Sequence, residues 1–478
     1  MIHNQMKNIL MLGLVLAVGA CGAKEPLLLE ESTPLIEAAP EQITGRLDVY
    51  NSMARGVKYN INTTIYNMKN KIEQVNPKSS VQNVVRSVYS GDDTDLSEAL
   101  RLLDFAIVYA TSTIENNLTW KDDYLFEKSA QHLALMAIRA HEDTMFAENK
   151  VRNIDRISRL ENKQVDALNE KLAKNGKLSE AEINYKKGLE VALYEQNQLR
   201  NQMMSEVTQY LRLIQGDTKK LSLEGRRFYE LEDFDDKYTL DIFQKTAAAN
   251  RKELVATKKY GYNNDYPLML NSVMSNYPEM EHLRINGVNI HDERYIKTLV
   301  SRARRVAENL IEITQNYRNI TLEMNKENVR SKLYQSIGDA IFIQVELAYN
   351  LVEQLSIQLA ALQEEVRKQR KDIKVKEKSV RGMGNAKIEL LNLKNKLLET
   401  ELQESKLIAS RAAALRSLYF YAGFSPFSRV LLEQKIKIIA DNLKIAFNQD
   451  MISMLTISPV VETGTKEWEV KDEDWDKG

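Results

Sequence analysis

Long stretches of this chain repeat apolar residues at intervals of three and four positions. Lys, Glu, Gln and Asn fill most of the positions between them. This spacing places the apolar side chains along one stripe of an α-helix, so it predicts amphipathic helices that pack against each other. The clearest runs are Ile154, Ile157, Val165, Leu168 and Leu172, and later Leu390, Leu393, Leu397 and Leu398.

Glycine and proline, the residues that most often end helices, are scarce in this chain, with 18 and 8 in 478 residues. None lies in the 84 residues between Gly91 and Gly176, and only Gly338 lies between Gly287 and Gly382. A helix of about 80 residues would be roughly 120 Å long, so we expect a break at Glu115–Asn117 or near Trp120. The pattern predicts an all-α fold of long helices.

Two turns of small and polar residues interrupt the helical pattern. In the first, Gly176 is expected to end one helix and Ser179 to cap the next. In the second, a pair of glycines precedes Asn385, which we expect to cap the last long helix. The exposed residues predicted at these two turns are Gly176, Lys177, Ser179, Gly382, Gly384, Asn385 and Lys387.

The helices that follow the two turns end at matching glycines, Gly216 and Gly423. These glycines are 207 residues apart, which is close to half of the mature chain. The match predicts an internal duplication of an antiparallel helical hairpin, and repeats of this kind stack side by side. We expect the first repeat at residues 43–235 and the second at residues 236–455.

The N-terminus has the pattern of a signal peptide, because Lys7 precedes an apolar run from Ile9 to Gly19. The run is too short for a membrane-spanning helix, which needs about 20 apolar residues. Val18–Cys21 resembles a lipobox, in which the cysteine is acylated after cleavage. We therefore expect a signal peptide at residues 1–20, lipidation of Cys21 and a linker at residues 21–42. An ordinary secretory leader with a chance cysteine is the alternative.

Composition excludes several functional classes. Charged residues make up 28% of the chain, but the net charge is −1, so there is no broad basic field for nucleic acid. Cys21 is the only cysteine, which excludes disulfides, cysteine metal sites and thiol catalysis in the mature chain. His132 and His141 are nine residues apart, unlike paired metal ligands on a helix, and we interpret them as solvated or packing residues.

No catalytic motif is present, and we interpret the chain as a protein without enzymatic activity and without a cofactor. There is no glycine-rich loop after a strand and no nucleophile elbow. The carboxylates have the spacing of solvated helix faces. We expect the acidic tail at residues 456–478 to be disordered, with an interaction peptide as the alternative.

Several segments resemble the TolC-like family of outer membrane efflux and secretion proteins. The family's first helix is similar to Leu47–Tyr50 and to Ala54–Ile61, which includes Lys58-Tyr59-Asn60. Its leucine–aspartate–phenylalanine–glycine corner is matched by Leu103–Ala106 with Tyr109, although Ala106 replaces the glycine. The second repeat is matched by Leu240–Leu254 with Ala249-Asn250-Arg251, by Gln344–Tyr349 and by Gly382–Gly423.

The resemblance implies that three copies form a periplasmic tunnel of helices topped by a membrane β-barrel. The chain departs from the family where the strands are expected. Only residues 76–96 lie in that position of the first repeat, and Ser79–Ser90 is better interpreted as one short helix. Arg302–Tyr349 is predicted to be continuously helical, and Lys258–Arg294 to be an ordered loop or short helices. We therefore expect the barrel strands to be reduced or absent.

The resemblance also implies a function and partners. The expected protein is a trimer, anchored by lipid at the outer membrane and facing the periplasm, which forms the helical conduit of a tripartite efflux or type I-like secretion system. Gly22 after Cys21 favours the outer membrane. The two turns would dock a periplasmic adaptor and an inner-membrane transporter. The alternative is a non-conducting helical accessory or scaffold of another cell-envelope complex.

Overall fold

The structure, a computed structural model, consists of helices joined by turns. It describes residues 41, 43, 47–75, 80–88, 96–115, 117–216, 223, 239–258, 293–321, 323–379 and 385–450, all of them within one unit that spans Ala38–Gly478. Within these ranges there is no strand, and a single isolated bridge joins Leu47 to Leu223. The prediction of an all-α fold is therefore confirmed for the described residues.

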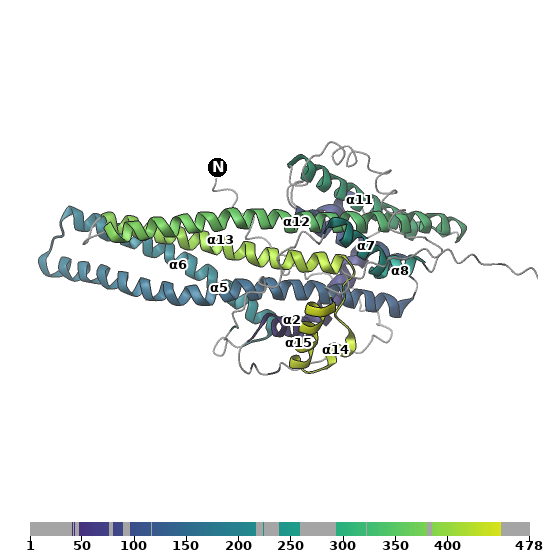
Figure 1. The fold of residues 1–478 in the computed structure, drawn as a ribbon, viewed down its shortest axis with the longest axis horizontal. Coiled ribbons are helices and arrows are strands. Elements are labelled where there is room, and N and C mark those ends of the chain that lie inside the picture. The colour runs from purple at the N-terminus through teal and green to yellow at the C-terminus, as the bar shows by residue number, and fades with distance from the viewer. Residues whose placement is uncertain are drawn as a thin grey trace, which may run out of the picture. The chain divides into compact units, whose positions relative to one another are not determined.

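Four long helices and a group of shorter ones make up the described chain (Figure 1). The long helices are α5 (Leu118–Asn175), α6 (Glu180–Ile214), α12 (Glu323–Ser379) and α13 (Asn385–Tyr421). The shorter elements are α2 (Val49–Gln74), α3 (Val81–Val88), α4 (Leu96–Ile114), α7 (Leu240–Asn250), α8 (Lys252–Lys258), α11 (Glu293–Asn319), α14 (Arg429–Glu433), α15 (Ile436–Ile445) and the π-helical turn Ala446–Asp450.

Helices α5 and α6 lie antiparallel. Lys171 near the end of α5 pairs with Glu182 at the start of α6. Further along, the Nε atom of Arg200 lies 2.6 Å from a carboxylate oxygen of Asp155. The pairs run in opposite order along the two helices, which defines their relative direction.

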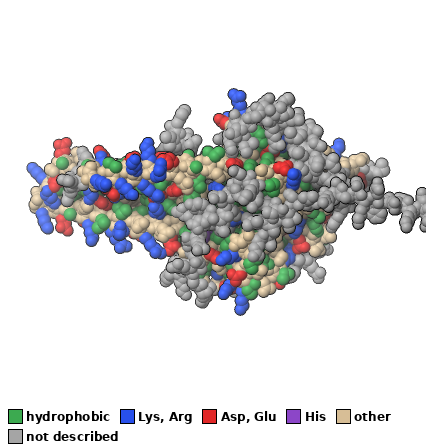
Figure 2. All heavy atoms as spheres, in the orientation of Figure 1, with side chains coloured by type: hydrophobic (Ala, Val, Ile, Leu, Met, Phe, Trp, Pro, Cys, Tyr) green, Lys and Arg blue, Asp and Glu red, His purple; other side chains and the backbone are tan. Residues whose placement is uncertain are grey.

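Helices α12 and α13 pack in the same manner. Arg370 of α12 pairs with Glu401 of α13 at 2.7 Å, and Arg411 of α13 donates to the Ser356 hydroxyl of α12 at 2.8 Å. Helix α13 also packs against both α5 and α6, so it joins the two pairs (Figure 1). Figure 2 shows side chains of both charge signs interspersed with apolar ones over these long helices.

The shorter helices pack at the ends of the long ones that lie away from the turns. Helix α2 packs on α5, α15 packs on α2, and α4 packs with α11 against α12. The crossing of α2 and α5 is close at Gly56, where a Cβ atom would lie 3.1 Å from the Cβ atom of Ala137. A larger residue than glycine would push these helices apart.

The expected break at Glu115–Asn117 is confirmed. Helix α4 ends at Ile114 and α5 begins at Leu118. The side chain of Asn117 accepts the N–H of Trp120 at 3.1 Å, so it caps the new helix. The short helix predicted within Ser79–Ser90 is also confirmed, as α3 at Val81–Val88.

The prediction of a continuous helix from Arg302 to Tyr349 is wrong. Helix α11 ends at Asn319, and α12 begins at Glu323. Ile320 and Thr321 are not helical. The chain reverses here because both helices carry apolar faces that pack on each other, and this contact decides the break without any glycine or proline.

Several predicted segments lie outside the described residues. They include the leader with Cys21, nearly all of the linker and the C-terminal tail. The loop predicted at Lys258–Arg294 is described only at its borders, where Lys258 ends α8 and Glu293 begins α11.

Candidate partner-docking site at the helix turns

The first turn is formed by the residues that the sequence indicated. Gly176 follows α5 with φ of +67°, and its N–H donates to the carbonyl of Leu172 at 2.8 Å. Positive φ favours glycine, because a Cβ atom would strain the backbone. Nothing lies within 4 Å of the place where a Cβ would be, so the turn itself is open.

Ser179 begins α6 with a capping box. Its hydroxyl accepts the N–H of Glu182 at 3.3 Å, and the Glu182 carboxylate accepts the N–H of Ser179 at 3.0 Å. The caps predicted at Gly176 and Ser179 are thus confirmed. Lys171 and the groups of Ser179 donate to Glu182 and lower the pKa of this exposed carboxyl to about 2.

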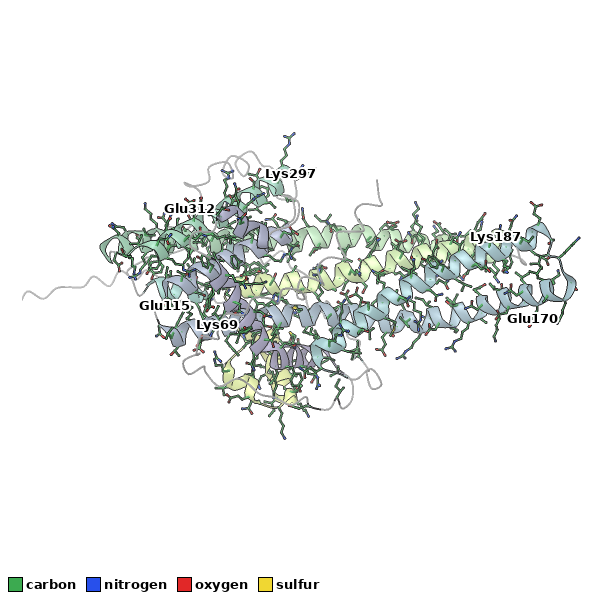
Figure 3. All side chains as sticks on the ribbon, turned by 180° about the vertical axis from the view of Figure 1, so that it is seen from behind. Lys69, Glu115, Glu170, Lys187, Lys297 and Glu312 are labelled. Carbon is green, nitrogen blue, oxygen red and sulfur yellow. The ribbon has the colours of Figure 1, made fainter. Side chains whose placement is uncertain are left out.

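The surface beside the first turn is polar and exposed. Lys177 lies in the turn and is exposed, as are Glu170 on α5 and Lys187 on α6. Figure 3 shows Glu170 and Lys187 near this turn, on the two helices that it joins. These groups are accessible to a partner, but their part in docking stays a prediction.

The second turn is described only from α13 onward. Gly382 and Gly384 lie outside the described residues, and Asn385 is described as the first residue of α13 without its side chain. Lys387 is described fully. Its ammonium donates to Gln164 of α5 at 2.6 Å and lies 3.7 Å from the Glu161 carboxylate, so its partners are within the chain.

The start of α13 contacts both α5 and α6. Gln164 accepts a hydrogen bond from Tyr185 of α6 at 2.7 Å in addition to the one from Lys387. An apolar cluster lies beside these bonds. Its buried members are Leu168, Tyr185, Leu189, Ala192 and Leu391, and Ile388 packs against them.

A glycine inside α6 permits this close contact. A Cβ atom at Gly188 would lie 2.5 Å from the Cδ1 atom of Ile388. Two helices can approach this closely only where one has no side chain. Sequence analysis did not single out Gly188, although a lone glycine inside a helical pattern is a recognised signal of close packing.

Polar residues set the register of α13 against the first pair. The Asn395 amide donates to the Ala192 carbonyl at 3.0 Å, and its oxygen accepts from Gln196 at 2.9 Å. Gln196 in turn accepts from the Ser158 hydroxyl at 2.9 Å. Because these groups are buried, a shift of α13 along α6 would leave them without partners. Sequence analysis missed this layer, whose only signal is polar residues within an apolar stripe.

Buried arginines bind the C-terminal ends of α6 and α13, the second helix of each long pair. Arg55 of α2 donates to the carbonyl of Ile214, the last residue of α6, at 2.9 Å. Arg251, between α7 and α8, donates to the carbonyl of Tyr421, the last residue of α13, at 3.0 Å. Both contacts satisfy carbonyl groups that a helix leaves unpaired at its C-terminus.

Arg251 belongs to a buried ionic cluster. Its guanidinium binds both carboxylate oxygens of Glu253 at 2.8 and 2.9 Å. Glu253 also accepts from Tyr124 at 2.9 Å and lies 3.2 Å from the ammonium of Lys128. Burial raises the pKa of Glu253, but the charges of Arg251 and Lys128 outweigh burial and hold this pKa well below its usual range. The buried charge is therefore compensated.

His141 is a packing residue, in line with its interpretation from the sequence. Its Nδ1 atom lies 2.9 Å from the Ser52 hydroxyl and 3.3 Å from that of Tyr210. All three side chains are buried, so this triad is closed to substrates. Burial lowers the pKa of His141 to about 4, which keeps the imidazole neutral at neutral pH.

The described residues hold no group of three or more His, Cys, Asp or Glu side chains arranged to bind a metal ion. Among the described helices, none combines the length and the apolar character needed to cross a membrane. Comparisons of the chain with protein-family models, with curated proteins and with solved structures find no match.

Proposed function

We propose that this chain is a lipoprotein, anchored through Cys21 at the outer membrane, that forms a periplasmic helical conduit for efflux or type I-like secretion. Three copies make up the conduit. The two turns dock a periplasmic adaptor and, with it, an inner-membrane transporter. The proposal rests on the resemblance of the sequence to the TolC-like family and on the geometry of the long helices.

The observation that carries the proposal is the equal size of the two helix pairs. The first helices, α5 and α12, have 58 and 57 residues. The returning helices, α6 and α13, have 35 and 37 residues. A buried arginine binds the end of each returning helix, Arg55 in one case and Arg251 in the other. These matches support two tandem copies of one hairpin, with boundaries near residues 43–235 and 236–455.

The outer helix faces support a ring of copies. Val191 and Tyr194 of α6 are 57% and 64% exposed, and Ile357 and Val375 of α12 are 51% and 63% exposed. Helix α13 packs against both α6 and α12. Two different apolar faces on one protomer fit head-to-tail contacts, which form a ring when the rotation between copies closes. Burial of these side chains between copies would remove apolar area from water.

The test is the oligomeric state of the mature Cys21→Ser protein, measured by light scattering together with negative-stain images in buffer without detergent. We expect trimers with a central passage. A monomer or dimer would overturn the conduit and favour the accessory or scaffold role.

A pair of matched variants tests the ring contact. Tyr194→Glu places a charge on the α6 face and is expected to yield monomers. Tyr66→Glu makes the same change at another tyrosine, 61% exposed on α2, and is expected to leave the trimer intact. Equal effects of the two variants would contradict the assigned contact.

A further inference from the structure

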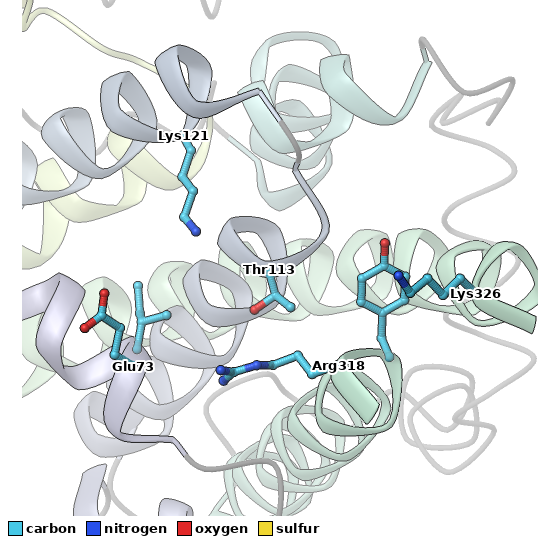
Figure 4. Close-up of a pocket in the computed structure, with 7 residues that line it drawn as sticks. Glu73, Thr113, Lys121, Arg318 and Lys326 are labelled. Carbon is cyan, nitrogen blue, oxygen red and sulfur yellow. The ribbon is translucent and has the colours of Figure 1, made fainter. Parts of the chain in front are cut away.

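A pocket of about 370 Å³ lies where several helices end. The ends of α2, α4 and α11 and the starts of α5 and α12 converge around it (Figure 4). Its volume falls within the range of small-molecule sites. It is lined by Ile72, Glu73, Thr113, Lys121, Tyr317, Arg318 and Lys326.

The charges around this pocket are mainly positive. Lys121, Arg318 and Lys326 come from three different helices, α5, α11 and α12, and Glu73 is the only carboxylate among the lining residues. The lining thus carries three positive charges and one negative charge. Cations brought together by separate helices repel each other, and a bound anion would relieve that repulsion.

Among these cations, Lys121 gives the strongest indication of an anion site. Burial lowers its pKa, and the nearby charge of Lys69 lowers it further. Asp122 and Glu73 act in the opposite direction, and Asp122 is paired with Lys69 at 2.7 Å. Within the described part of the chain, the structure records no hydrogen bond or ion pair for the Lys121 ammonium. A partly desolvated ammonium without such a partner is stabilised when an anion binds beside it.

Arg318 is held in place beside the pocket. One of its terminal nitrogens donates to the carbonyl of Val75 at 2.9 Å and lies 3.4 Å from the hydroxyl of Tyr109. The neighbouring Tyr317 accepts a hydrogen bond from Arg330 at 3.0 Å, which fixes its ring. The guanidinium is therefore positioned before any ligand arrives, which reduces the entropy lost on binding.

We propose that this pocket binds a phosphate-bearing anion, with Lys121 as its ligand and Arg318 and Lys326 as further positive charges in the lining. Arginine and lysine are the side chains that bind a phosphate group best. The volume leaves room for a small organic body beside the phosphate. Either a soluble phosphate ester or the headgroup of an anionic lipid has this chemistry. The inference is independent of the proposed conduit.

The first experiment measures binding of glycerol phosphate to the mature Cys21→Ser protein by calorimetry, at constant ionic strength. The matched variants are Lys121→Gln and Lys332→Gln. Lys332 is an exposed lysine of α12 that does not line the pocket. We expect Lys121→Gln to weaken binding about tenfold, as for the loss of one charge-assisted hydrogen bond. Lys332→Gln should bind like the parent protein.

A second arm distinguishes the two sources of phosphate. Flotation of the same three proteins with vesicles of phosphatidylglycerol or phosphatidylcholine shows whether a lipid headgroup is bound. A lipid headgroup would be assigned if the parent protein floats with phosphatidylglycerol vesicles but not with phosphatidylcholine vesicles. The Lys121→Gln variant should then fail to float, and the Lys332→Gln variant should float like the parent. Binding of glycerol phosphate with the same dependence on Lys121 would assign a soluble ester. Absence of binding in both arms, or equal losses in the two variants, would overturn the proposal.

Discussion

The first turn, around Gly176, and the end of α13 near Gly423, which we call the base, contain similar chemical groups. These groups are exposed to water at the turn and buried at the base. Each holds a glycine with positive φ, Gly176 at the turn and Gly423 at the base. Each also holds a carboxylate bound by cationic and backbone groups, Glu182 at the turn and Glu253 at the base. At the turn these groups are in contact with water. At the base they are enclosed by other helices. We therefore expect burial, more than local geometry, to decide how much each of these groups contributes to the free energy of unfolding.

The largest expected effect is at the base. Arg251→Met leaves Glu253 buried with only Lys128 and Tyr124 as partners, and it removes the contact to the end of α13. Loss of one partner of a buried pair costs about 3–5 kcal/mol. Urea unfolding of the Cys21→Ser protein measures it. Lys171→Met, which removes the exposed partner of Glu182, should unfold near the parent midpoint. Similar midpoints for both variants would break the comparison.

The two glycines give the next largest contrast. A Cβ atom at Gly423 would lie 2.8 Å from the backbone carbon of Asn250, in addition to the strain of φ at +100°. Gly423→Ala should cost about 2–4 kcal/mol, because the neighbouring backbone must move. Gly176→Ala has strain but free space and should cost about 1 kcal/mol. Thermal unfolding of both variants provides the measurement. A larger effect at Gly176 would contradict the role assigned to burial.

The pH dependence sharpens the same contrast. Because the pKa of His141 is about 4 in the folded chain, the unfolded chain binds an extra proton between about pH 6.5 and 4. Stability contributed by the neutral imidazole is complete above pH 6.5 and falls as the pH drops, by at most roughly 3 kcal/mol. His141→Gln should lose this part of the pH dependence in urea unfolding at pH 7, 5.5 and 4. An unchanged profile would show that His141 is not buried as described.

The exposed counterpart titrates in a lower range. The depressed pKa of Glu182 means that its stabilising contacts are present above about pH 4.5 and are lost as the pH falls toward 2. Because the side chain of Glu182 remains partly exposed to water, Glu182→Gln should change the profile much less than His141→Gln does. The two variants can be compared in the same series of measurements.

The smallest expected effect is at the cap of the first turn. Ser179→Ala removes the hydroxyl that accepts the N–H of Glu182, at a cost of about 1 kcal/mol. Hydrogen exchange should report it as faster exchange confined to the first turn of α6. Ser179→Asp serves as control, because aspartate also caps helices and should preserve protection. Uniformly faster exchange along α6 would show that the cap matters for the whole pair.

Much of the helical architecture was predictable because its signals are local. The breaks at Asn117 and Gly176 are marked by residues with caps or conformations that act within one helical turn. Gly423 adopts positive φ just after α13, whereas just after α6 the left-handed residue is Gln215, the neighbour of Gly216. The all-α class followed from the spacing of apolar residues. The docking role of the turns is a separate matter and stays a proposal.

The misses involve partners that are distant in sequence. The turn at Ile320–Thr321 has no glycine or proline, and only the packing of α11 on α12 favours it. Gly188 was overlooked because its meaning depends on Ile388, 200 residues away. The pocket between α2, α4, α5, α11 and α12 joins side chains from five helices, and none of its lining residues belongs to a motif identified in the sequence.

The sequence by itself determined that this chain forms long amphipathic helices and where several of them begin and end. Periodicity, caps and breakers act over a few residues, so they can be recognised without knowing the fold. The tertiary structure alone decided which charges are buried, which helices touch and where a pocket opens. Burial and charge compensation depend on groups brought together by folding, and the chain order does not record those distances.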